Sequence, residues 1–158
     1  MARPKKPITP AGYARLEKEL NDLWRQERPR VTAEVSAAAE LGDRSENAEY
    51  IYGKKRLREI DKKIKYLSGL LDRLEVIDPK TVESDKVEFG ATVVCEDEEG
   101  KKLVYIIVGE DEVEAKQRRI SPKSPIGKAL MGKRVDDDVL VIRPAGELEL
   151  VVVEIRYE

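Results

Sequence analysis

The chain has 158 residues, of which 39% are charged and 5% aromatic, and its formal net charge is −2. This length suits one ordinary domain or two small ones, and so much charge with so few aromatic side chains is typical of an extended helical protein rather than a compact globule. No apolar run is long enough to span a membrane, and the basic N-terminal segment lacks the apolar core of a secretory signal, so we expect a cytoplasmic protein.

The missing histidine excludes several kinds of site. Without it there are no Ser-His or Cys-His catalytic pairs and no histidine-ligated zinc, and the single Cys95 has no partner for a disulfide or a thiolate metal site. Any metal chemistry must use oxygen ligands, which favours Mg²⁺ or Mn²⁺. Basic residues exceed acidic ones in residues 1–78, and acidic ones exceed basic ones in residues 79–158, so the two halves are expected to meet different partners.

The first predicted element is a long helix. Thr9 followed by Pro10 is a typical helix start, because the hydroxyl caps the helix and proline at the first helical position loses no hydrogen bond. Pro29 is expected to kink this helix or to cost it a backbone hydrogen bond. The apolar stripe of the helix comprises Tyr13, Leu16, Leu20, Leu23, Val31, Val35, Ala38 and Leu41.

A second long helix is predicted to end at Asp78, before Pro79. Each helix has about 30 residues, so the two should form an antiparallel coiled-coil hairpin about 45 Å long within residues 1–78. Ala37 to Ala39 should let the helices approach closely. The second helix repeats apolar residues at three and four positions, as in a heptad seam, through Leu57, Ile60, Ile64, Leu67, Leu71 and Leu74.

The C-terminal half, residues 79–158, has the pattern of strands. A short helix is predicted from Ser124-Pro125 to Met131, with Gly132 as its stop. The fold class is therefore α+β: a helical hairpin followed by a small, mostly antiparallel sheet with one helix. Runs rich in Val and Ile predict four strands, at residues 87–95, 103–108, 139–142 and 148–157.

The turn between the two long helices reads GDRSENAEY, residues 42–50, and is called the tip here. Asp43 and Glu46 are three positions apart, which is the spacing of a helix capping box, and Ser45 is a rival cap. Alternatively, both carboxylates face outward and bind Mg²⁺ weakly. Two carboxylates rarely hold Mg²⁺ alone, so a second macromolecule would have to complete the site.

A basic run, KKRLREIDKK, follows the tip at residues 54–63. One interpretation is a solvated helix face whose charges pair within the helix, as Arg58 with Asp61 and Glu59 with Lys62. The other is a surface that grips nucleic-acid phosphates close to the acidic tip. The basic residues concerned are Lys54, Lys55, Arg56 and Arg58.

The tip, the basic run, LNDLWRQERP in the first helix and ISPKSPIGKAL in the second half together resemble the bacterial Gre family of transcript cleavage factors. The resemblance covers the whole chain, and Arg44, the LWRxERP stretch and the basic run are similar to the GreB branch. It implies an N-terminal coiled coil with a C-terminal FKBP-like domain that docks on the rim of the RNA polymerase secondary channel. It also implies a monomer when free, with no membrane partner.

The resemblance further implies an accessory factor rather than an enzyme, one that stimulates cleavage of the backtracked nascent RNA 3′ end by polymerase. Asp43 and Glu46 would hold a Mg²⁺ shared with polymerase, and Ser45 and Asn47 would position them. Ser124 and Pro125 would lie in the polymerase-docking segment, where the preceding Pro122-Lys123 departs from the family pattern. The RNA contacts would be Lys54, Lys55, Arg56 and Arg58.

Two alternatives remain at this point. A binding-only channel inhibitor would dock in the same way and block nucleotide entry without cleavage. A prolyl isomerase would need an apolar pocket rich in aromatic residues, and residues 79–158 offer only Phe89, Tyr105 and Tyr157.

Overall fold

The chain folds into two compact units, one helical and one built on a sheet. The computed structural model describes residues 5–42 and 46–158. The helical unit is Tyr13–Arg73, and the sheet unit joins the residues up to Gly12 with Leu74–Glu158. The N-terminal segment therefore belongs with the C-terminal half, whereas the sequence-based division falls once, between residues 78 and 79.

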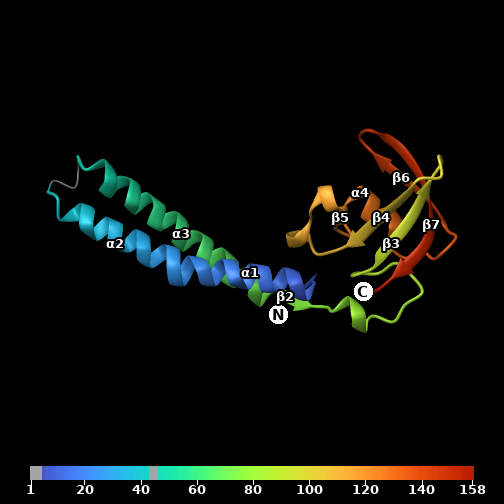
Figure 1. Cartoon of the computed structure of the whole chain (residues 1–158), viewed down its shortest axis with the longest axis horizontal. Helices are drawn as coiled ribbons and strands as arrows, with labels where there is room; N and C mark the ends of the chain where they lie inside the picture. Colours follow the sequence, from blue (N-terminus) through green and yellow to red (C-terminus); the bar gives the residue numbers. More distant parts are fainter. Residues whose placement is uncertain (1–4, 43–45) are drawn as a thin grey trace. The chain divides into compact units, whose positions relative to one another are not determined.

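The helical unit is a long antiparallel hairpin, as predicted. Its first arm runs without interruption through α1 (Pro10–Asp22), the π-helical turn η1 (Leu23–Glu27) and α2 (Arg28–Ala39). Its second arm is α3 (Ala48–Asp72). In Figure 1 the cyan α2 and the green α3 lie side by side and run in opposite directions.

The predicted start of the first arm is confirmed. Helix α1 begins at Pro10, and the Thr9 hydroxyl oxygen accepts a hydrogen bond from the Gly12 backbone N–H at 3.2 Å. This bond satisfies one of the N–H groups that a helix start leaves without a partner in the helix itself.

The expected disturbance at Pro29 takes the form of the π-helical turn. The backbone N–H of Arg28 donates to the carbonyl of Leu23, five residues back. In an ordinary α-helix the Pro29 ring would press against the carbonyl four residues earlier, and proline has no N–H to donate. The wider turn directly before Pro29 inserts one extra residue while the helix continues.

Apolar side chains line the seam between the arms. On α3 the buried positions Gly53, Ile60 and Leu67 are seven residues apart, which is the heptad spacing. The arms are close at Gly53, where an added Cβ would lie 2.6 Å from a Val35 methyl group. The buried apolar side chains of the first arm are Leu16, Leu23, Val31 and Ala38.

The prediction that the second arm reaches Asp78 is wrong. Helix α3 ends at Asp72, and β2 (Leu74–Val76) follows, paired in parallel with β1 (Lys6–Ile8). The helical spacing in the sequence continues through Leu74. However, this segment finds a strand partner at the far N-terminus, and local periodicity cannot reveal such a partner. Ile8 is fully buried by this arrangement.

The sheet unit holds a five-stranded sheet in the order β5-β4-β3-β7-β6. Its neighbours are antiparallel except for β4 and β5, which confirms the predicted small, mostly antiparallel sheet. The short helix α4 (Pro125–Leu130) of this unit packs against β6. The strands are β3 (Thr92–Asp97), β4 (Lys102–Ile107), β5 (Arg119–Ile120), β6 (Asp138–Arg143) and β7 (Gly146–Arg156), and short 3₁₀ turns occupy Pro79–Thr81, Glu110–Glu112 and Ala115–Gln117.

One predicted strand starts too early. Residues 87–91 form no regular strand, and β3 begins only at Thr92. Gly90 has φ of 89°, a left-handed conformation that interrupts an extended chain. Val87 is nevertheless fully buried in the sheet core. An apolar residue is found here because the side chain is buried, not because the backbone pairs in a strand. The two-residue strand β5 was not predicted.

Candidate functional site

The candidate site is the end of the hairpin, where the chain passes from α2 to α3. Helix α2 ends at Ala39, and the Leu41 backbone N–H still bonds to the Ala38 carbonyl at 3.1 Å. Gly42 has φ of 123°, which side chains rarely permit. Two of the predicted catalytic residues, Asp43 and Ser45, lie outside the described residues.

Asn47 joins the two arms at this end. Its side-chain oxygen accepts a hydrogen bond from the Tyr50 backbone N–H at 3.1 Å, which makes Asn47 the N-cap of α3. Its side-chain NH₂ group donates to the Ala38 carbonyl at 2.7 Å. One amide therefore starts α3 and ties that start to the end of α2.

Glu46 is exposed and comes directly before this cap. The capping-box interpretation needs Glu46 as the third residue of the helix, and it is wrong because α3 begins two residues later, at Ala48. The sequence offered Asp43 or Ser45 as the cap, and the geometry gives that role to Asn47. The Glu46 carboxylate is left outside the helix, facing solvent.

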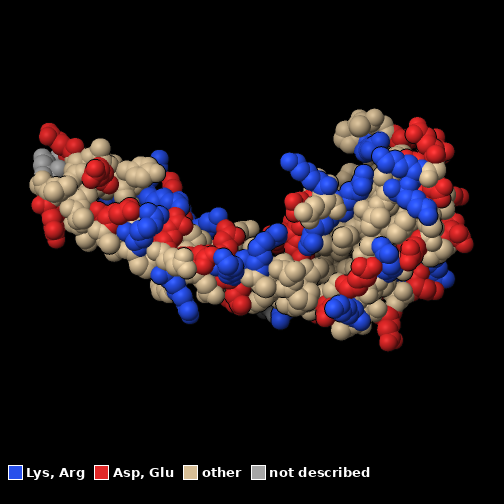
Figure 2. Space-filling view, in the orientation of Figure 1, with Lys and Arg blue, Asp and Glu red and all other residues tan. Residues whose placement is uncertain are grey.

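The described end of the hairpin offers carboxylate oxygens to a hard cation such as Mg²⁺, but not a complete set of ligands. Carboxylate oxygens are the ligands that Mg²⁺ prefers, but Mg²⁺ takes six ligands in strict octahedral geometry. Both polar atoms of the Asn47 amide take part in hydrogen bonds within the hairpin. Figure 2 shows acidic side chains at the end of the hairpin. The exposed Glu40 and Glu49 also flank the turn, and neither was predicted as a site residue.

Three of the four predicted RNA contacts form a basic face on α3. Lys54, Lys55 and Arg58 are exposed, and helical spacing of three and four residues puts them on one side. Among the described residues none of these three has an ion-pair partner. The same spacing extends the face to the exposed Lys62 and Lys65, and Lys65 lies beyond the run that sequence analysis singled out.

The alternative of charges paired within α3 is wrong for the two pairs it named. Asp61 pairs across the hairpin with Arg28 at 2.7 Å, and Glu59 is 3.7 Å from Arg56. Arg58 therefore keeps its charge available, as does Lys62. The first arm, not α3 itself, supplies the partner of Asp61.

Arg56 differs from the other three predicted RNA contacts. Its guanidinium forms an ion pair with Glu27 on η1 and a longer one with Glu59. Its side chain is 38% exposed and that of Glu27 is 27% exposed. The structure thus separates Arg56 from the basic face of Lys54, Lys55 and Arg58.

The predicted docking residues Ser124 and Pro125 start helix α4. The Ser124 hydroxyl accepts a hydrogen bond from the Gly127 N–H at 3.0 Å and donates to the Ser121 carbonyl at 2.7 Å, so Ser124 is an N-cap. Pro125 occupies the first helical position and is exposed. The capped-helix interpretation is correct for Ser124, and Pro125 is available to a partner.

A groove of about 490 Å³ lies beside this segment, within the sheet unit. Lys123 forms an ion pair with Glu110 at 2.5 Å, and this contact holds the pKa of the Glu110 carboxyl below its usual value. Lys6 reaches the same carboxylate at 3.5 Å. Lys5 and Lys6 line this groove together with Pro122-Lys123. Local sequence patterns could not predict this, because the two segments are more than a hundred residues apart.

The single cysteine and two aromatic residues of the sheet unit have structural surroundings. Burial raises the pKa of the Cys95 thiol to about 11, so it is a protonated core residue at neutral pH. Tyr105 is buried in the sheet core, and the Tyr157 hydroxyl donates to the Lys86 carbonyl and accepts from the Glu88 N–H. Tyr105 and Tyr157 thus both take part in the packing or hydrogen bonding of the sheet unit. Among the helices that the structure describes, none has the length and hydropathy to cross a membrane.

Fold and site together define a two-part protein: a helical hairpin with an exposed carboxylate at its end, and a small sheet unit. Residues 6–76 match a family described as the N-terminal part of transcription elongation factors GreA and GreB, and residues 82–157 match the C-terminal part. The chain therefore belongs to the GreA/GreB family of transcription elongation factors.

Relatives place the chain on the GreB side of this family, as the resemblance implied. Transcription elongation factor GreB of Pseudomonas aeruginosa is 53% identical over 150 residues, covering 95% of this chain and 89% of that protein. GreB of Haemophilus influenzae is 50% identical over 151 residues, covering 96% of each. The crystal structure of Thermus aquaticus Gfh1 is 30% identical and covers 98% of this chain and 99% of that one, with a TM-score of 0.44.

Proposed function

We propose that this elongation factor enters the secondary channel of RNA polymerase and stimulates endonucleolytic cleavage of the 3′ end of backtracked nascent RNA. The observation that carries the proposal is the exposed Glu46 at the end of the hairpin, beside the Asn47 cap that ties the two arms together. Membership of the GreA/GreB family supports it. The cleaved complex has a new aligned RNA 3′ end and resumes elongation.

In this proposal the factor is not an enzyme by itself but donates residues to the polymerase active site. Glu46 and Asp43 supply anionic oxygens, and Ser45 and Asn47 position them. A Mg²⁺ ion shared between these carboxylates and polymerase would stabilise the developing charge and lower the pKa of the attacking water. The Asn47 amide supports this role because its two hydrogen bonds hold the start of α3 against the end of α2.

The basic face behind the tip is proposed to hold the extruded RNA. Lys54, Lys55 and Arg58 are exposed cations without ion-pair partners in the described part of the chain, which suits them to phosphate contact. Phosphate contacts position a nucleic acid without reading its sequence. That property fits a factor that must act on any transcript.

Docking on polymerase is assigned to the sheet unit. Pro125 is exposed at the start of α4, and Pro122-Lys123 borders the adjoining groove. Lys123 is 77% exposed although it pairs with Glu110, so it can still meet an acidic or polar partner surface. We propose that this segment contacts the rim of the channel and that the free factor is a monomer.

The test uses purified polymerase stalled in backtracked complexes with labelled nascent RNA. We expect the full chain to shorten the RNA, release a 3′ fragment and restore elongation. Glu46→Gln is expected to lower the cleavage rate by about 100-fold, because an anionic ligand worth several kcal/mol at the metal is lost. Asp43→Asn should act in the same way.

Polymerase binding by both variants should stay at the wild-type level, measured by competition with labelled wild-type factor. The matched control is Glu34→Gln, which changes an exposed carboxylate on α2 and should cleave at the wild-type rate. Full cleavage by Glu46→Gln would contradict its role. Inhibition of elongation by the wild-type factor without any shortened RNA would favour the binding-only inhibitor instead.

A further inference from the structure

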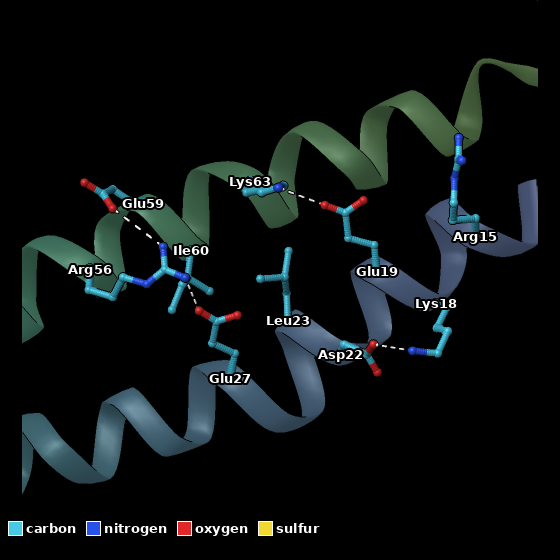
Figure 3. A pocket seen from close by; sticks show the side chains of 10 residues that line it. All are labelled: Arg15, Lys18, Glu19, Asp22, Leu23, Glu27, Arg56, Glu59, Ile60 and Lys63. Atoms are coloured by element: carbon cyan, nitrogen blue, oxygen red, sulfur yellow. Dashed lines mark hydrogen bonds and ion pairs between the residues drawn. The ribbon is translucent and has the colours of Figure 1, made fainter. Parts of the chain in front are cut away.

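A groove of about 390 Å³ opens between the two arms near the π-helical turn (Figure 3). Leu23 and Ile60 contribute apolar side chains to it, and the rest of its lining is charged. Figure 3 shows the Arg56 guanidinium between Glu27 on η1 and Glu59 on its own helix.

The π-helical turn explains why a glutamate meets Arg56 here. Glu27 is the last residue of η1 and lies four residues from each of the buried Leu23 and Val31. It therefore occupies a seam position that an apolar residue would fill in a regular coiled coil. Its half-buried side chain faces Arg56, three residues after the buried Gly53.

This pair is a polar layer within an apolar seam. Toward the tip lies the close approach of Gly53 to Val35, and away from the tip lie Leu23 and Ile60. In the described part of the hairpin, Arg28 with Asp61 and Lys63 with Glu19 also join the arms, and Glu27 is less exposed than any side chain in these pairs. In coiled coils, a polar residue at a single seam position can specify the register of the paired helices.

From this geometry we propose that Arg56 is a positioning residue that sets the register of α3 against the first arm, and that it does not contact RNA. The proposal rests on the proposed function, because register matters through the place of Glu46. To reach a phosphate, Arg56 would have to leave the half-buried Glu27 carboxylate without its partner. Phosphate contact by the exposed Lys54, Lys55 or Arg58 would break no ion pair in the described part of the chain.

Arg56 lies close enough to the start of α3 that a change of register there would displace the residues at that end of the hairpin. Arg56 is nine residues after Asn47 on one helix, about 13 Å along its axis. A slip of one helical turn at this layer would move the start of α3 by about 5.4 Å relative to α2. Misplacement of a catalytic group by as little as about 1 Å can cost about 100-fold in rate.

A charge exchange tests the proposal. Arg56→Glu and Glu27→Arg each place like charges together, and each is expected to lower the cleavage rate at saturating factor by about 10- to 100-fold. The double variant Glu27→Arg/Arg56→Glu restores the cross-hairpin pair and should recover most of that rate, when all these variants are compared in a Glu59→Gln background that removes the neighbouring like charge. The factor concentration for half-maximal cleavage should change little, because docking lies on the sheet unit.

Two further variants remove the ion pair without adding a like charge. Arg56→Gln and Glu27→Gln create no repulsion, so they report on the lost pair even if the single exchanges unfold the hairpin. The matched control is the more exposed cross-hairpin pair, where Lys63→Gln should leave the cleavage rate near wild type. Adding Glu27→Arg to Arg58→Glu, in contrast, should not restore the cleavage rate. In the described part of the chain Glu27 forms its ion pair with Arg56 and not with Arg58.

A second readout needs no polymerase. The Tyr50 amide donates to the Asn47 side chain, so its hydrogen-exchange protection in the free factor reports on the capped end of the hairpin. Protection should fall in each single exchange and return in the double variant. If wild-type factor failed to cleave RNA, the proposed function would fail and this measurement would still decide the register.

Two results would overturn the assignment. One is a double variant as defective as Arg56→Glu, which would mean that the cation itself is needed at that position. The other is wild-type cleavage and wild-type Tyr50 protection in every single variant.

Discussion

At the scale of single residues, Glu112 is the most heavily bonded carboxylate described. Its fully buried carboxylate accepts hydrogen bonds from the backbone N–H groups of Thr9 at 3.0 Å and Gly109 at 2.8 Å. It also accepts a hydrogen bond from the Thr9 hydroxyl. The Arg119 guanidinium lies 3.7 Å away. A Cβ added at Gly12 would come within 2.2 Å of the carboxylate, so the surroundings leave room for no more than glycine there. One carboxylate thereby fastens the first turn of α1 to the C-terminal half of the chain.

We expect Glu112→Gln to lower the free energy of unfolding by about 1–3 kcal/mol, because an NH₂ group in place of Oε1 could not accept from the Thr9 hydroxyl and would face the Arg119 guanidinium without a negative charge. Urea denaturation of the full chain measures this. Glu114→Gln, at an exposed position nearby, serves as the control and should change stability by less than about 0.5 kcal/mol. An equally small effect at Glu112 would show that its bonds contribute no more than an ordinary surface contact.

At the scale of the helices, Gly53 is where backbone approach matters most. Alanine normally stabilises a helix by about 1 kcal/mol relative to glycine, yet a Cβ here would lie 2.6 Å from the Val35 methyl group. We therefore expect Gly53→Ala to give no stabilisation or a net loss in thermal unfolding of the hairpin. In a Val35→Ala background, which removes that methyl group, the same change should become stabilising by up to about 1 kcal/mol. Additivity of the two substitutions would contradict the close contact.

The helical hairpin could be predicted from the sequence because the residues that specify each arm lie close together along the chain. Spacing of three and four residues predicted both arms, Thr9-Pro10 predicted the start of α1, and Pro29 predicted the disturbance that became the π-helical turn. Pairings across the chain were beyond such signals. The partner of β2 lies in the first eight residues, and Asp61 and Arg56 pair with residues on the opposite arm.

The candidate site was predictable to a similar extent. The sequence singled out Glu46 and Asn47, and the structure puts Glu46 in solvent and Asn47 at the start of α3. It did not identify Asn47 as the cap, because Asp, Ser and Asn are all good caps and stand within five residues of one another. The choice depends on the Ala38 carbonyl, which reaches Asn47 only once the arms have folded together.

At the scale of the whole chain, the hairpin is an insertion into the sheet unit. The first arm leaves that unit after β1 and the second arm returns to it at β2, and these two strands are paired in parallel. Within the sheet unit, the segments just before and just after the hairpin are held by the pairing of β1 with β2 and by the bonds of Thr9 to Glu112. The main sheet core lies wholly within residues 87–157, so it does not itself require the N-terminal segment.

This arrangement predicts how the sheet unit behaves without the rest of the chain. A fragment of residues 74–158 retains the main sheet core but loses the β1 partner of β2 and the Thr9 donors of Glu112. We expect it to fold with lower stability than the same unit in the full chain, seen as faster hydrogen exchange of the β3 and β7 amides. Glu112→Gln should cost the fragment much less than the full chain, because two of the three donors to that carboxylate are already gone. An equal cost of Glu112→Gln in the fragment and in the full chain would mean that Gly109 and Arg119, not Thr9, account for its contribution, and that the N-terminal segment is not fastened through this residue.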